Sequence, residues 1–194
     1  MIEVTEIDPK QLKEYATIPM RILVDSQFHV EIRDRGLGGL ALIEEPVSQP
    51  WVKDYYEGEP RGVAKWLEMF NTNHWGFFLA HSGRELVGGA TIASRSDGVS
   101  MLDGRSDLAV LWDIRVMPEW ERQGVGTALF RRAVEWSRTQ GLTQLKIETQ
   151  NTNVGACRFY AELGCELRGI VHHAYAAGQG RWVDEVELHW WLDL

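Results

Sequence analysis

The feature that most constrains the fold is a strand, helix and strand succession in the second half of the chain. Apolar residues at 108–116 (LAVLWDIRV) predict a buried strand, and helical spacing of apolar residues covers 127–140. A second strand is predicted at 142–149, after Gly141 as the cap of the helix. A strand, crossover helix and strand predict a sheet with helices packed on it, which excludes a β-sandwich and a helix bundle.

Shorter patterns predict further elements around this unit. Strands are predicted at residues 2–7, 21–32, 40–43, 75–81, 85–94, 166–176 and 183–192. Helices are predicted at residues 9–15, 63–70 and 154–163. Glycine-containing turns are predicted at residues 35–39, 82–84 and 178–180. The chain of 194 residues is therefore expected to form one domain with a mixed α/β or α+β sheet.

The charge of the chain disfavours nucleic acid as a partner. The chain has 28 acidic and 20 basic residues, a formal net charge of −8. A general nucleic-acid-binding protein needs a basic surface for phosphate contacts. The charge is also uneven, because residues 119–168 sum to +1 whereas residues 1–60 and 169–194 sum to −6 and −3.

Three features predict a cytoplasmic protein without a membrane segment or a metal. The first residues, MIEVTEIDPK, lack the basic and apolar regions of a signal peptide, and no apolar run approaches the ~18 residues that span a bilayer. Cys157 and Cys165 belong to no C-x-x-C motif, which favours structural thiols in a reducing compartment. His172 and His173, as neighbours in a predicted strand, would point to opposite faces and form no metal site.

The segment between the strand at 108–116 and the helix at 127–140 has the composition of an anion site. Gly124 and Gly126 stand just before the helix, where backbone N–H groups and the helix dipole favour an anion. Arg122 adds a positive charge, so phosphate or pyrophosphate is the expected ligand. A tight turn with no ligand explains the two glycines equally well. Neither the G-x-G-x-x-G nor the G-x-x-x-x-G-K-[ST] pattern is present.

Two blocks of residues resemble the motifs of the GNAT acetyltransferase superfamily. The first block consists of Ile114, Arg115, Val116, Pro118 and the run Glu121-Arg122-Gln123-Gly124-Val125-Gly126-Thr127-Ala128-Leu129. The second consists of Asn153, Ala156, Phe159, Tyr160 and Gly164. Two blocks in the family's order and spacing are far more specific than either alone. The resemblance implies a GNAT fold, with about six to seven strands in a mixed central sheet, a crossover helix after the fourth core strand and helices on both faces.

The resemblance covers residues 75–194, with an acetyl-CoA-binding core at 108–164 and a variable acceptor-side region at 1–74. Within the superfamily, the streptothricin acetyltransferases are similar at Glu148-Thr149-Gln150, Ala174-Tyr175-Ala176, Glu45 and Val52-Lys53-Asp54-Tyr55. Two positions depart from the family pattern. Glu121 stands where Arg or Gln is usual, and its carboxylate would repel pyrophosphate if it pointed inward. Cys165 stands where an aromatic residue is commoner, which we interpret as a change in packing.

The resemblance implies direct transfer of the acetyl group of acetyl-CoA to an amine, without a metal. It implies acetyl-CoA contacts at Ile114, Arg115, Val116, Glu121, Arg122, Gln123, Gly124, Val125, Gly126, Thr127, Asn153, Ala156 and Tyr160. An alkyl ammonium, with a pKa of about 10.4, must lose a proton before it attacks, and the departing thiolate needs one.

Three residues are candidates for these proton transfers. Tyr160 occupies the position of the family's acid tyrosine, and Glu148 lies at the offset of the base glutamate in the ribosomal-protein and N-terminal acetyltransferase branch. Asp113 is the rival base, although a carboxylate in an apolar strand is also explained as a structural group that needs a partner.

We expect the acceptor to be a small cationic amine, because the regions outside the acetyl-CoA core carry the negative charge. The resemblance implies a streptothricin-like antibiotic of the aminoglycoside type, and a polyamine-like metabolite is the other candidate. One alternative is a protein N-terminal or lysine acetyltransferase. Another is a CoA-binding sensor without transfer activity. By analogy with the family a homodimer is expected, with the C-terminal WWLDL strand as its contact.

Overall fold

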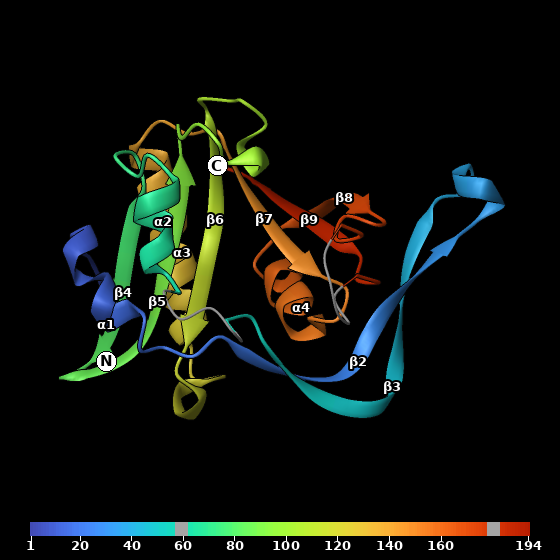
Figure 1. Cartoon of the computed structure of the whole chain (residues 1–194), viewed down its shortest axis with the longest axis horizontal. Helices are drawn as coiled ribbons and strands as arrows, with labels where there is room; N and C mark the ends of the chain where they lie inside the picture. The colour runs from blue at the N-terminus through green and yellow to red at the C-terminus, as the bar shows by residue number, and fades with distance from the viewer. Residues whose placement is uncertain (57–61, 178–182) are drawn as a thin grey trace. The chain divides into compact units, whose positions relative to one another are not determined.

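The computed structural model describes residues 1–56, 62–177 and 183–194 (Figure 1). The chain packs as two compact units. The first unit comprises Met1–Met20, Tyr55–Ile147 and Trp191–Leu194, and the second comprises Arg21–Asp54 and Glu148–Trp190. Two strands, β7 (Gln144–Gln150) and β9 (Glu187–Asp193), contribute residues to both units. That the chain forms a single domain therefore stays a prediction.

Among the described residues, seven strands form the central sheet in the order β1-β4-β5-β6-β7-β9-β8. The remaining bounds are β1 (Ile2–Glu6), β4 (Gly76–Ser82), β5 (Glu85–Ser94), β6 (Leu108–Val116) and β8 (Glu166–Val171). The pairs β1–β4, β4–β5 and β5–β6 are antiparallel, whereas β6 and β7 pair in parallel. The mixed sheet predicted from the sequence is therefore confirmed.

Four α-helices are described: α1 (Leu12–Tyr15), α2 (Ala64–Met69), α3 (Val125–Thr139) and α4 (Val154–Glu162). Helix α3 follows β6, the fourth strand of the central sheet in chain order, which confirms the predicted crossover helix. No helix in the described part of the chain is long and apolar enough to cross a membrane.

Helices cover both faces of the sheet in the first unit, with α1 and α2 on one face and α3 on the other (Figure 1). A Cβ atom on Gly89 would lie 2.6 Å from the ring of Tyr15 in α1. A Cβ atom on Gly88 would lie 2.9 Å from Val125 in α3. Neighbouring residues of a strand point to opposite faces, so these two glycines of β5 let both helical layers pack closely.

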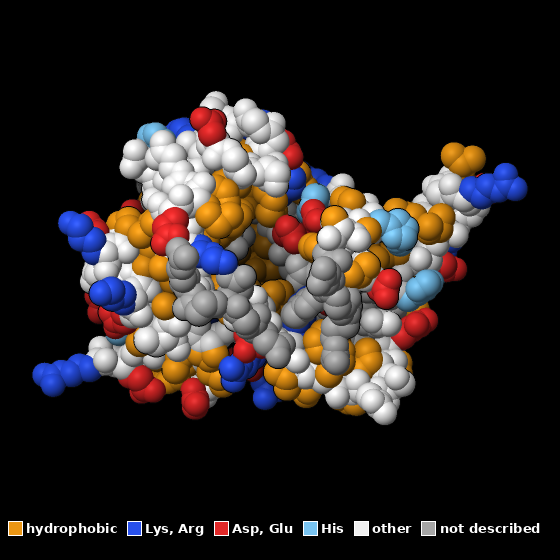
Figure 2. Space-filling view, in the orientation of Figure 1, with side chains coloured by type: hydrophobic (Ala, Val, Ile, Leu, Met, Phe, Trp, Pro, Cys, Tyr) orange, Lys and Arg blue, Asp and Glu red, His pale blue; other side chains and the backbone are white. Residues whose placement is uncertain are grey.

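The second unit contains a two-stranded hairpin of β2 (Arg21–Ile32) and β3 (Leu40–Asp54). The prediction of β2 is confirmed, but β3 continues to Asp54 through Pro46 and Pro50, well beyond the predicted 40–43. Both strands are edge strands, where proline is tolerated because its missing N–H is not needed on the outer side. The hairpin extends beyond α4 and β8 of the same unit, and hydrophobic and basic side chains gather at its tip, where Leu37 is 90% exposed (Figures 1 and 2).

The last predicted strands are shorter in the structure. Strand β8 ends at Val171, and the following residues, to 177, form turns with His173 at φ 61°. The prediction of a strand at 166–176 is wrong beyond Val171, because His173 has a left-handed backbone that a strand does not contain. In the turns that follow, the Tyr175 hydroxyl donates a hydrogen bond to Glu148 on β7. The argument from opposite strand faces therefore does not apply to His172 and His173, whose rings lie 6.2 Å apart. The described residues contain no group of metal-ligating side chains.

The C-terminal strand β9 begins at Glu187 rather than at 183. The predicted glycine turn at 178–180 lies outside the described residues. Cys157 and Cys165 are free, buried thiols, and burial raises the pKa of each to about 11. Both thiols are therefore protonated near neutral pH and unreactive.

Candidate active site

The predicted anion loop joins β6 to α3 in the first unit. Gly124 is the N-cap of α3 at φ 86°, and no side chain of the described residues caps this helix. Arg122 also has a positive φ, 57°. Left-handed residues in such a turn direct successive backbone N–H groups toward one point, and the uncapped first turn adds further donors and the helix dipole. The loop therefore has the geometry of an anion site.

The side chains of this loop are mostly exposed. Glu121, Arg122, Gln123 and Gly124 face solvent, Val125 is buried, and Gly126 and Thr127 are half-buried. The Nε2 group of Gln123 donates a hydrogen bond of 2.7 Å to the carbonyl of Glu119, which closes the turn. The loop thus offers backbone N–H groups, with Arg122 and Glu121 as exposed charges of opposite sign.

Strand β6 is irregular where the pantetheine arm of acetyl-CoA is predicted to lie. Asp113 pairs with Thr91 and Leu111 pairs with Ile92, so Trp112 is an extra residue in a β-bulge. In the described ladder, pairing with β7 ends at Leu111. Beyond that point, residues 114–116 pair with β5 on one edge, and the other edge offers N–H and C=O groups. The predicted contacts of Ile114, Arg115 and Val116 with acetyl-CoA stay predictions.

Asp113 forms a buried ion pair with Arg115. Nε and Nη2 of Arg115 each lie 2.8 Å from an oxygen of Asp113, and both side chains are less than 5% exposed. The Tyr15 hydroxyl donates to the same carboxylate, and the Arg115 guanidinium lies 4.4 Å from the centre of the Tyr56 ring. Burial alone would lower the pKa of Arg115, but the charge of Asp113 raises it. The carboxylate therefore has the partner that its burial requires, which favours a structural role for Asp113.

Glu148 lies in the second unit, half-buried on β7. Its Oε1 atom accepts hydrogen bonds from the hydroxyl of Tyr175 and, at 3.1 Å, from Nε2 of Gln150. Burial raises the pKa of Glu148, although these two hydrogen bonds oppose the shift. A carboxyl group with a raised pKa accepts a proton more readily near neutral pH, so this arrangement suits a general base.

A buried ion pair of Lys53 and Glu185 lies next to this group. Nζ of Lys53 lies 2.6 and 2.8 Å from the two oxygens of Glu185, and the side chains are 1% and 5% exposed. The same Nζ atom donates to Oε1 of Gln150 at 3.4 Å, and the hydroxyl of Thr152 donates to Glu185 at 2.8 Å. Burial lowers the pKa of Lys53, whereas Glu185 opposes the shift. We call Lys53, Glu148, Gln150, Thr152, Tyr175 and Glu185 the Lys53 network.

The second motif block folds as the start and centre of α4. Asn153 is the N-cap, and its Oδ1 atom accepts a hydrogen bond of 3.1 Å from the backbone of Ala156. Tyr160 is buried, and its ring meets that of Phe159 edge-on with centres 5.2 Å apart. Asn153 and Ala156 thus serve the helix cap. Their contacts with acetyl-CoA, and the acid role of Tyr160, stay predictions.

Sequence reasoning missed most of the Lys53 network as site residues. In the sequence, only the scattered matches to the streptothricin acetyltransferases point to Lys53, Gln150 and Tyr175. Glu185 carried no signal, because its partner Lys53 is 132 positions away. In the structure, the residues of these separate sequence matches belong to one buried, hydrogen-bonded group.

Comparison with known proteins assigns the family. The family model described as Acetyltransferase (GNAT) family matches residues 41–165. The chain belongs to the GNAT acetyltransferase family. Streptothricin acetyltransferase A of Bacillus subtilis (strain 168) is 31% identical over 119 residues, which is 61% of this chain and only 61% of that protein. Streptothricin acetyltransferase of Escherichia coli is 27% identical over 183 residues, 94% of this chain and 91% of that protein.

A solved structure confirms the GNAT fold. The crystal structure of a putative streptothricin acetyltransferase from Bacillus anthracis str. Ames in complex with acetyl coenzyme A has a TM-score of 0.78 to this chain. It covers 100% of both chains at 22% sequence identity, so this likeness concerns the fold.

Proposed function

We propose that this GNAT protein transfers the acetyl group of acetyl-CoA directly to a primary amine of a small cationic acceptor, such as a streptothricin-like compound. The observation that carries the proposal is the half-buried carboxyl group of Glu148, held by Tyr175 and Gln150 and raised in pKa by burial. Similarity to proteins named streptothricin acetyltransferases supports the choice of acceptor.

The first unit carries most of the residues proposed to bind acetyl-CoA. The residues of its loop fit a pyrophosphate, because α3 starts without a side-chain cap and Arg122 and Gly124 have positive φ angles. Residues 114–116 offer backbone groups for the amides of the pantetheine arm. Asp113 is assigned a structural role, because Arg115 and Tyr15 satisfy its carboxylate.

The second unit is assigned the proton transfers. The acceptor ammonium loses a proton to Glu148, and the neutral nitrogen attacks the thioester carbonyl. A bond forms between nitrogen and the acetyl carbon, and the carbon–sulfur bond breaks. The thiolate leaves with a proton from Tyr160, for which the sequence motif is the support. The nitrogen then releases its second proton, which restores the Tyr160 hydroxyl, so the net proton released is the one that Glu148 takes. Restoring a neutral amine from an ammonium of pKa about 10.4 costs roughly 4–5 kcal/mol at pH 7, so a base that takes this proton accelerates transfer.

Replacing Glu148 with Gln tests the assignment. E148Q is expected to lower kcat by about 10²- to 10⁴-fold with the Kd for acetyl-CoA unchanged, because the amide cannot accept the proton. Thiol release from acetyl-CoA measures kcat, and calorimetry measures Kd. The matched control is E166Q, which removes the same charge from an exposed position of the second unit.

The choice of acceptors separates the alternatives. The panel contains streptothricin, simple amines and peptides. An unchanged kcat in E148Q would remove Glu148 as the base. Thiol release with peptides alone would establish a protein acetyltransferase, and tight acetyl-CoA binding with no release for any amine would establish a sensor.

A further inference from the structure

A small cavity of the second unit has no part in the chemistry above. Its volume is about 290 Å³, and its walls are Gln27, Trp51, Asn151, Thr152, Asp184 and Glu185. They come from β2, from β3, from the turn after β7 and from the segment before β9. This volume suits one functional group with a few carbon atoms rather than a drug-sized ligand.

Asn151 fixes the shape of the cavity. Its backbone and side chain make two hydrogen bonds of 2.9 Å with the backbone of Phe28 on β2. The backbone and side chain of Asn151 make two further hydrogen bonds, of 3.0 and 2.9 Å, with the backbone of Val186, which is next to Glu185. One buried residue thereby joins three of the four segments, so the cavity is formed before a ligand arrives.

The lining of the cavity selects for a positive charge. Asp184 and Glu185 provide carboxylates, Gln27 provides an amide oxygen, and Trp51 provides an aromatic ring of the kind that attracts cations. Lys53 is not among the lining residues and is 1% exposed, so it compensates Glu185 without facing a ligand. Asp184 is exposed and forms no ion pair with any residue of the described ranges, so it adds a negative charge to the cavity wall.

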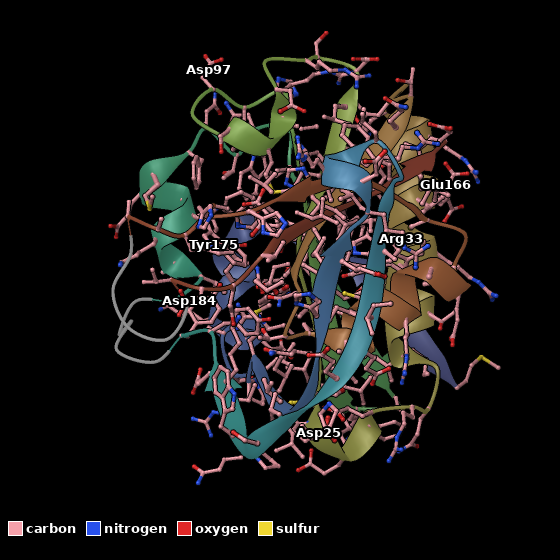
Figure 3. The ribbon with its side chains drawn as sticks, turned by 90° about the vertical axis from the view of Figure 1, so that its right-hand side faces the viewer. Asp25, Arg33, Asp97, Glu166, Tyr175 and Asp184 are labelled. Carbon is pink, nitrogen blue, oxygen red and sulfur yellow. The ribbon has the colours of Figure 1, made fainter. Side chains whose placement is uncertain are left out.

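The cavity is linked to Glu148 through the Lys53 network. From Glu185 the hydrogen bonds run to Lys53 at 2.6 Å, from there to Gln150 at 3.4 Å, and on to Glu148 at 3.1 Å. A ligand in the cavity is thus three hydrogen bonds away from the proposed base. Figure 3 labels Tyr175, at the Glu148 end of this network, and Asp184, at the cavity.

We propose that this cavity binds a second cationic group of the acceptor, so that the preferred acceptor is a dication with one amine at Glu148 and another charge in the cavity. The inference rests on the proposed acetyl transfer for the role of Glu148, but the cavity can be tested without acetyl-CoA.

The test compares 1,5-diaminopentane with 1-aminopentane, which has the same carbon chain and one amine. Calorimetry on the full chain without acetyl-CoA is expected to show tighter binding of the diamine. D184N should weaken diamine binding by about two- to fivefold, the size of a partly exposed ion pair, and should not change binding of the monoamine. W51L is a second variant, expected to weaken the diamine through loss of the aromatic wall. The control is D34N, which removes an exposed aspartate at the hairpin tip, where φ is 46° and asparagine is well tolerated.

Activity then separates the two proposals. In thiol release, the ratio of kcat/KM for diamine over monoamine should fall in D184N and W51L and stay constant in D34N. Diamine binding that depends on Asp184, without thiol release, would uphold the cation site and overturn acetyl transfer. Equal use of both amines, with no effect of D184N or W51L on binding or on the ratio, would overturn the second-cation site while acetyl transfer stands.

Discussion

The two units each bury an ion pair, and the two pairs are built differently. Asp113 and Arg115 are two residues apart on β6, so strand alternation places them on one face, where Tyr15 and Tyr56 enclose them. Lys53 and Glu185 come from segments 132 residues apart and connect a cavity with Glu148. The first pair is closed by its neighbours, whereas the second continues into groups that can meet a ligand. In this protein, a buried ion pair therefore indicates a proposed site only where its hydrogen bonds lead on to groups that a ligand can reach.

The largest expected effects come from breaking either pair. R115M and K53M should each lower the free energy of unfolding by about 3–5 kcal/mol, because each leaves a buried carboxylate without its countercharge. Urea denaturation of each variant measures the loss. R21M is the control: Arg21 pairs with Asp54 at 2.7 Å but is 64% exposed, so its loss should stay below about 1 kcal/mol.

The pH dependence of acetyl transfer should distinguish the two variants. Lys53 and Glu148 attract each other electrostatically, so removing the cation raises the pKa of Glu148. The acid limb of the kcat/KM profile should move to higher pH in K53M and stay in place in R115M. Equal pH profiles for both variants would show that the Lys53–Glu185 pair is no more closely linked to Glu148 than the Asp113–Arg115 pair is.

The same contrast shows what the sequence could predict. The strands β2, β5 and β6 were predicted residue for residue, because apolar patterns and turn residues mark their ends locally. The sequence also predicts that Asp113 lies within an apolar strand and needs a partner, because the alternation of side chains along a strand depends only on neighbouring residues. Partners from distant segments, such as Lys53 and Glu185, could not be predicted from local patterns. The same holds for the hydrogen bond that Tyr175, in the turns at 172–177, donates to Glu148.

A smaller effect is expected from Y175F. The hydroxyl of Tyr175 donates to Glu148 and lowers the pKa of this carboxyl group, so its removal raises that pKa further. Because the base acts when deprotonated, the acid limb of kcat/KM should move to higher pH. A hydrogen bond to a charged group is worth about 1.5–3 kcal/mol, so the limb should move by about one pH unit or more. E166Q, at an exposed position of the second unit, serves as the control. An acid limb that does not move in Y175F would show that the Tyr175 hydroxyl does not set the pKa of Glu148.

The smallest expected effect concerns the first unit and the charge of its loop. Glu121 is exposed beside Arg122, and its carboxylate disfavours an anion at the start of α3. E121Q should therefore tighten acetyl-CoA binding by about two- to fivefold, the 0.3–1 kcal/mol typical of one charge near a helix end. The gain should shrink as salt is raised, because exposed charges are screened, and kcat should not change. E119Q, two residues earlier, should gain less, and equal gains in both variants would show a general charge effect rather than a pyrophosphate at the loop.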